Sequence, residues 1–161
     1  MAELYTALAG AVVGAFATVA IRRRFEKVQT TIAQFRAYHS PDMAEARNIA
    51  WRFLKVKYPK QNKPFHMLWS DKKGANHEDY VALVKVIYFW FLLDSLKQQR
   101  ELLPALAHKM LAYQFGHWKE ALQPLYDATT ADGRDLPEWI VIMEPDRMGW
   151  LDPERPHRVW I

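Results

Sequence analysis

The opening segment of the chain constrains its fold more than any other feature. From Ala2 to Ile21 the sequence is almost entirely apolar, and its only charged side chain, Glu3, lies at the very end. As a helix, roughly twenty residues extend about 30 Å, which is the thickness of the hydrocarbon core of a bilayer. We therefore expect a transmembrane helix that the mature protein keeps.

Two other fates of this segment fit the sequence less well. A helix buried in a protein core normally has a polar face, whereas Thr18 is the only polar side chain between Leu8 and Ile21. A secretory signal peptide begins with basic residues, and none precedes the apolar run, although residues 15–17 have the small-x-small pattern of a cleavage site. A retained transmembrane helix accounts for both the missing polar face and the missing basic residues before the apolar run.

Basic side chains directly follow the apolar run and predict its orientation. They are Arg22, Arg23, Arg24 and Lys27. Lysine and arginine beside a span stay on the cytoplasmic side, and they attract anionic lipid by about 1 kcal/mol each. We expect a single-pass protein of a cell inner membrane, with its N-terminus outside and its C-terminal domain cytoplasmic. The four residues are assigned to the membrane surface and not to nucleic acid.

Small residues recur along one face of the predicted span. Gly10 and Gly14 form a GxxxG motif, which Ala7 and Ala17 extend at similar spacing. Small side chains let a second helix approach closely, which is how transmembrane helices pair. We assign these four residues to helix packing, against another subunit or a second copy. The alternative is that the stripe faces lipid.

The rest of the chain predicts a small all-α cytoplasmic domain. The span continues as a juxtamembrane helix, because no Gly or Pro interrupts the sequence before Ser40. Proline at 41, a Tyr-Pro pair at 58–59 and proline at 124 set the expected ends of further helices. The expected helices cover residues 25–39, 41–57, 65–69, 77–93 and 104–122.

One face of the juxtamembrane helix is apolar. Phe25, Val28, Ile32 and Phe35 fall at heptad-like spacing. Three partners for this face stay open: the chain's own domain, a second copy, or another subunit.

The end of the chain differs in kind. Residues 136–161 contain four prolines and three tryptophans, without a helical period, and only 139–143 has a strand-like pattern. We expect an extended tail that either lies on its own domain or docks in a groove of another protein, and we assign partner docking to Trp139, Trp150 and Trp160. The predicted division of the chain is 1–24 anchor, 25–39 juxtamembrane helix, 40–130 helical domain and 131–161 tail.

The sequence carries little sign of catalytic chemistry. With no cysteine, disulfides and thiolate metal sites are excluded, and the six histidines are scattered. The glycines form no phosphate-binding loop, and no serine lies in a nucleophile elbow. The spacing allows Asp94 to pair with Lys97 or Arg100 on the helix surface, a contact worth tenths of a kcal/mol and without catalytic weight. We expect no metal, no cofactor and no enzymatic activity.

Two segments carry a resemblance to a known group of proteins. They are EARNIAWRFL, from Glu45 to Leu54, and the long helical stretch from Asp79 to Leu122. The layout loosely resembles bacterial single-pass membrane proteins of unknown function with a small helical cytoplasmic domain. The resemblance implies a topology and no activity.

Three functions follow from these features. The first is a non-catalytic accessory subunit of an inner-membrane complex, which anchors and clamps larger subunits. The second is a single-pass scaffold that self-associates into a homo-oligomer. The third is a membrane-tethered enzyme or small-ligand-binding protein with a pocket near Tyr88, Trp90, Tyr113 and His117.

Overall fold

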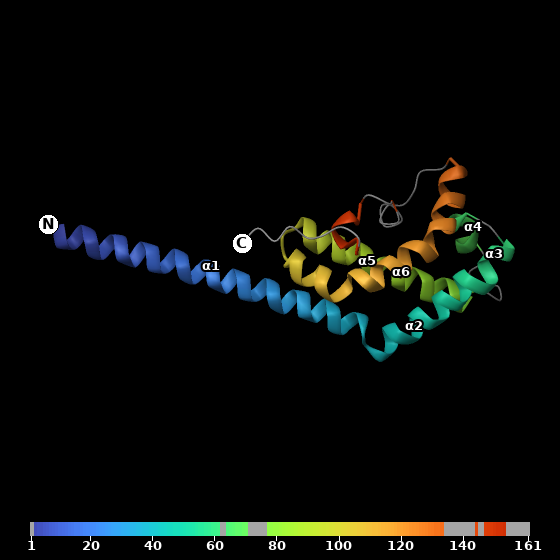
Figure 1. Cartoon of the computed structure of the whole chain (residues 1–161), viewed down its shortest axis with the longest axis horizontal. Helices are drawn as coiled ribbons and strands as arrows, with labels where there is room; N and C mark the ends of the chain where they lie inside the picture. The colour runs from blue at the N-terminus through green and yellow to red at the C-terminus, as the bar shows by residue number, and fades with distance from the viewer. Residues whose placement is uncertain (1, 62–63, 71–76, 134–143, 145–146, 154–161) are drawn as a thin grey trace.

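The computed structural model confirms the all-α prediction. It describes residues 2–61, 64–70, 77–133, 144 and 147–153, with the backbone alone for 2–13, 61, 69 and 70. Every regular element in these described residues is a helix (Figure 1). The segment 139–143, for which a strand was considered, lies outside the described residues.

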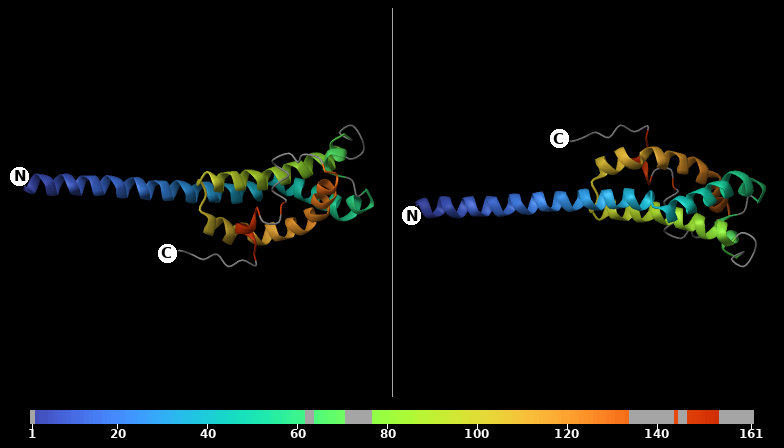
Figure 2. Two further views of the ribbon diagram at one scale, coloured as in Figure 1. Left: turned by 90° about the horizontal axis from the view of Figure 1, so that it is seen from above. Right: turned by 90° about the horizontal axis from the view of Figure 1, so that it is seen from below.

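The first helix, α1 (Ala2–Tyr38), runs without a break through the predicted boundary between anchor and juxtamembrane helix. Its N-terminal part projects alone beyond the rest of the molecule, and its C-terminal part lies along the domain (Figures 1 and 2). The Ser40 side chain then accepts a hydrogen bond from the Met43 backbone N–H, which caps the next helix as the Ser-Pro pair predicts.

The helix that follows does not stop at Pro59, so this predicted end is wrong. It comprises α2 (Pro41–Arg52), a π-helical turn (Phe53–Lys57) and α3 (Tyr58–Gln61). A proline ring clashes with the carbonyl four residues earlier in a regular helix. The wider π turn, in which the Tyr58 N–H bonds to the Phe53 carbonyl, relaxes the backbone just before Pro59.

The short predicted helix is present as α4 (Phe65–Ser70). Phe65 and Leu68 are buried, so this turn closes one end of the core. The Phe65 backbone N–H donates to the Thr129 hydroxyl at 3.0 Å, which fixes α4 to the end of α6.

The two long helices of the domain are α5 (His77–Gln98) and α6 (Pro104–Ala131). They form a hairpin: α5 runs back toward the projecting part of α1, and α6 returns (Figures 1 and 2). The predicted start of α5 is confirmed. One face of α5 lies in the core, but Val81, Tyr88 and Leu92 on another face are 49%, 54% and 38% exposed.

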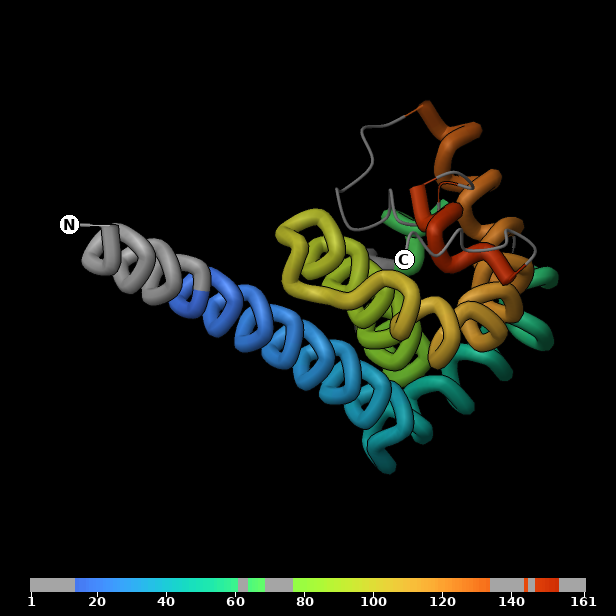
Figure 3. Tube along the Cα trace, turned by 60° about the vertical axis from the view of Figure 1, so that its left-hand side comes forward, coloured from blue at the N-terminus to red at the C-terminus, as the bar shows by residue number. Residues whose placement is uncertain are grey.

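Pro124 does not end α6, which contradicts the prediction. The helix continues to Ala131, and Figure 3 shows α6 bending along its course. The continuation buries Leu125 fully and Thr129 almost fully. Burying a leucine stabilises a fold by about 1.5–3 kcal/mol, which is comparable to the cost of proline inside a helix.

Aromatic rings join the elements around one core residue, Trp90. Its ring lies 5.3 Å from Tyr38 of α1 and 5.3 Å from Phe115 of α6, measured between centroids. All three side chains are buried. The end of α1 is therefore part of the core and not a loose linker.

Candidate functional site

The projecting part of α1 presents apolar side chains to its surroundings. Phe16, Val19, Ile21 and Phe25 are 74%, 50%, 70% and 62% exposed. Isolated exposed apolar residues are ordinary, but a cluster on one projecting rod is typical of a surface that contacts lipid or protein.

The structure describes the side chains of two of the four small residues that are predicted to pack against another helix. Gly14 and Ala17 are exposed, and a Cβ added at Gly14 would meet nothing within 4 Å. The side chains of Ala7 and Gly10 lie outside the described residues. Helix packing by this stripe stays a prediction.

The basic group next to it is accessible. Arg22, Arg23 and Arg24 are exposed and Lys27 is half-buried. Arg22 pairs with Glu26 at 3.0 Å, an exposed contact worth a few tenths of a kcal/mol. Within the part of the chain that the structure describes, no helix is both long enough and apolar enough to cross a membrane.

The apolar face of the juxtamembrane helix is divided between two environments. Phe35 packs against the core of the chain's own domain, whereas Phe25 is exposed. The Thr31 hydroxyl, 1% exposed as a residue, accepts a hydrogen bond from the Leu103 backbone N–H at 3.0 Å. Thr31 is the first buried residue among the described side chains of α1, and Lys27, Val28 and Thr30 before it are half-buried.

Part of the tail lies on its own domain. Met148 and Leu151 are fully buried beside a 3-10 turn (Gly149–Leu151), and the Trp150 indole donates to Asp94 Oδ1 at 3.1 Å. Of the two alternatives for the tail, the described residues 147–153 take the first. Trp139 and Trp160 lie outside the described residues, so docking of a partner by the tail stays a prediction.

Asp94 does not form the surface ion pair that the spacing allows. Its side chain is 3% exposed and accepts hydrogen bonds from Trp150, from Gln98 Nε2 at 2.6 Å and from Arg147 Nε at 3.4 Å. The carboxylate is buried because the tail covers it, and it fastens the tail to α5.

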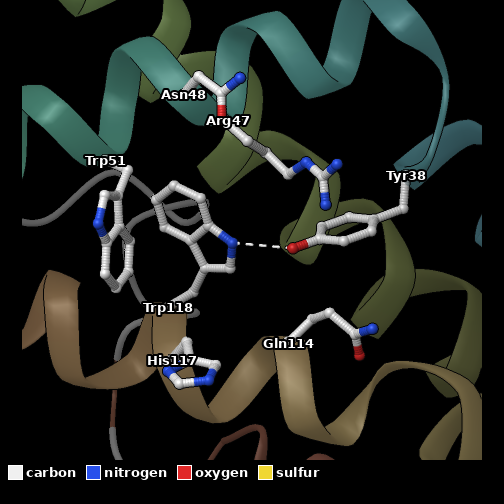
Figure 4. A pocket seen from close by; sticks show the side chains of 7 residues that line it. All are labelled: Tyr38, Arg47, Asn48, Trp51, Gln114, His117 and Trp118. Carbon is white, nitrogen blue, oxygen red and sulfur yellow. Dashed lines mark hydrogen bonds between the residues drawn. The ribbon is translucent and has the colours of Figure 1, made fainter.

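A cleft of about 370 Å³ lies between α2 and α6, beside the end of α1. Residues spaced three and four apart line it from both helices: Arg47, Asn48 and Trp51 lie on one side, Gln114, His117 and Trp118 on the other, and Tyr38 at one end (Figure 4). The Trp118 indole donates to the Tyr38 hydroxyl at 2.9 Å. The Trp51 and Trp118 rings meet edge to face, with centroids 5.6 Å apart.

Two polar groups of this cleft lack a hydrogen-bond partner within the part of the chain that the structure describes. Arg47 Nε and Gln114 Oε1 are buried and have no hydrogen-bond partner among the described residues. The Arg47 guanidinium lies over the Tyr38 ring at 4.1 Å, and none of the residues that line the cleft is acidic. An unpaired buried donor costs about 1–3 kcal/mol, so stability alone does not explain this arrangement.

The pocket predicted near Tyr88, Trp90, Tyr113 and His117 does not form. Tyr88 and Tyr113 are 54% and 71% exposed and Trp90 is in the core, so the four do not share a cleft. Only His117 lines the cleft between α2 and α6. The spacing of its lining residues is visible in the sequence, but the same spacing describes any helix face.

The tyrosines with raised pKa values belong to the core rather than to this cleft. Burial raises the pKa of Tyr58 to about 12, and the negative charge of Asp127 adds to the effect. Burial alone raises the pKa of Tyr80 to about 12. Among the described residues, no three histidine or acidic side chains gather as a metal site requires.

The comparisons with known proteins do not identify the chain. No protein-family profile, curated protein or solved structure matches it. Any functional conclusion therefore depends on the sequence and the geometry of the chain itself.

Proposed function

We propose that this protein is a membrane-anchored, non-catalytic accessory subunit, whose helical domain holds larger subunits of an inner-membrane complex. The observation that carries the proposal is the form of α1. One uninterrupted helix has exposed apolar side chains over its projecting part, such as Phe16 and Ile21, and core contacts at its other end through Tyr38. A rod of this kind couples whatever holds its apolar end directly to the domain.

The sequence of α1 supports a bilayer as the environment of that end. The part of the chain that the structure describes contains no helix that is long and apolar enough to cross a membrane, so the support comes from the sequence. The run from Ala2 to Ile21 has about the length of a span, and the basic group that follows it predicts a cytoplasmic domain. Thr31 is the first buried residue among the described side chains of α1, so the domain lies close to the membrane surface.

The exposed face of α5 supports a protein partner. Val81, Tyr88 and Leu92 lie on the same helix at spacings that place them on one side, and all three are exposed. Large apolar side chains in a row are typical of surfaces that bind other proteins. We assign the contact with larger subunits to this face.

The test is co-purification after extraction in a mild detergent. We expect larger membrane subunits in stoichiometric amounts with the wild type, and their loss with the Tyr88→Lys variant. Tyr113→Lys is the control, because Tyr113 is a tyrosine on α6 that is still more exposed than Tyr88, at 71% against 54%. A lone monomer from the wild type, or equal effects of the two variants, contradicts the proposal.

Self-association remains a second candidate, favoured by the open space around Gly14. The Gly10→Ile/Gly14→Ile variant should abolish pairing of the helix in a membrane reporter assay. Unchanged pairing removes this candidate.

A further inference from the structure

We propose that the cleft between α2 and α6 binds a small aromatic carboxylate. The Arg47 guanidinium receives the carboxylate, and the rings of Trp51 and Trp118 hold the aromatic part (Figure 4). This inference is independent of the proposed anchoring and accessory role.

The size and lining of the cleft fit a small molecule. Its volume of about 370 Å³ lies within the range of ligand sites, which combine aromatic walls with a few polar groups. Trp51 is 37% exposed although its ring contacts both Trp118 and His117, so a ligand has an indole face to cover.

The charge of the cleft selects an anion. Arg47 is its permanent cation, and no residue that lines it is acidic. Lys55 adds a second positive charge nearby, with Nζ 5.1 Å from the centre of the Trp51 ring. The guanidinium offers paired donors in a planar fork, which matches a carboxylate better than a neutral group.

The guanidinium is also held in position before any ligand arrives. Its Cζ lies 4.1 Å from the centre of the Tyr38 ring, and Tyr38 is itself fixed by the hydrogen bond from Trp118. Among the described residues no acceptor pairs with Arg47 Nε, so on that edge the guanidinium has no competing protein partner. The Gln114 amide, whose Oε1 is likewise unpaired, provides a hydrogen bond to a polar substituent.

The test is a titration of the full chain in mild detergent with three acids: benzoate, 4-hydroxyphenylacetate and indole-3-acetate. Each acid is paired with its primary amide, which has nearly the same shape and no charge. The indole N–H resonances of Trp51 and Trp118 report binding, and the Trp51→Phe and Trp118→Phe variants assign them. We expect saturable shifts of both resonances by at least one acid and at least tenfold weaker binding of the matching amide.

Micelle partitioning favours the uncharged amides, so it cannot produce this preference. The Arg47→Met variant keeps most of the apolar stem and should weaken acid binding at least tenfold. Arg52→Met is the control, because Arg52 is exposed on the same helix and does not line the cleft. Circular dichroism establishes that each variant is folded.

Three results overturn the proposal. They are the absence of saturable binding by all three acids, equal binding of acid and amide, and unchanged binding by a folded Arg47→Met variant. If Arg47→Met does not fold, the comparison of acid with amide on the wild type still decides. None of these results bears on co-purification of larger subunits, so the two proposals fail separately.

Discussion

The contact between Asp94 and Trp150 permits a quantitative test of how the tail is held. The carboxylate is 3% exposed and accepts from the Trp150 indole at 3.1 Å. A hydrogen bond to a charged group contributes about 1.5–3 kcal/mol. Because Trp150 is only half-buried, water replaces part of that contribution when the bond is lost. We therefore expect a coupling energy of about 1–2 kcal/mol between the two side chains.

A double-mutant cycle measures this coupling. Asp94→Leu removes the carboxylate and keeps the branch at Cγ, and Trp150→Phe removes the N–H while keeping an aromatic ring. Free energies of unfolding come from urea titrations of the wild type, both single variants and the double variant, followed by circular dichroism in mild detergent. The nearby Arg147, 3.4 Å from Asp94 with a side chain 35% exposed, contributes less than the indole.

The control cycle pairs Asp94→Leu with Trp51→Phe. Trp51 lies in the cleft between α2 and α6, and no contact joins it to Asp94. Its coupling should be within about 0.5 kcal/mol of zero. The reasoning is refuted if the coupling of Asp94 with Trp150 is no larger than that of the control.

Two further predictions concern the core. The Thr31→Val variant leaves the Leu103 N–H without its acceptor and should lower the free energy of unfolding, measured in urea titrations, by about 1–3 kcal/mol. The control, Thr130→Val, changes an exposed position and should alter this free energy by less than about 0.5 kcal/mol. Equal losses in the two variants contradict the role of Thr31. The raised pKa values of Tyr58 and Tyr80 predict that the protein has its full stability below pH 10 and loses stability as the pH rises from about 10 to 12. The reason is that the two tyrosines lose their protons at lower pH in the unfolded state than in the folded state. The free energy of unfolding should fall by about 1.4 kcal/mol per pH unit for each tyrosine. The Tyr58→Phe/Tyr80→Phe variant should have a flatter profile over that interval, and an identical profile refutes the prediction.

The sequence predicts the positions of most helices because their start signals are local. The Ser-Pro pair before α2 acts within one turn, and the acidic first turn of α5 does the same. Their ends depend on distant contacts. Pro124 stays inside α6 because Leu125 and Thr129 beyond it find a core and a partner in α4, which no local signal shows.

The same difference between local and distant contacts explains why the sequence places Asp94 on the surface although it is buried. Asp94 looks like a surface residue at the end of an apolar run, but its indole partner is 56 positions away in the chain. The residues that line the cleft are likewise brought together by contacts between distant parts of the chain. Arg47 and Gln114 come from two helices whose relative placement the sequence does not specify, so their place in one cleft could not be predicted.

The central claim is that α1 spans a bilayer and holds the domain on the cytoplasmic side. The chain has no cysteine, so single-cysteine variants report position without interference. We would label Ala2→Cys, Val12→Cys and His39→Cys variants with a membrane-impermeant maleimide, in intact spheroplasts and in inverted inner-membrane vesicles. The account predicts labelling of Ala2→Cys only in spheroplasts, of His39→Cys only in inverted vesicles, and of Val12→Cys in neither. Labelling of Val12→Cys as fast as His39→Cys, or recovery of the protein outside the membrane fraction, contradicts it.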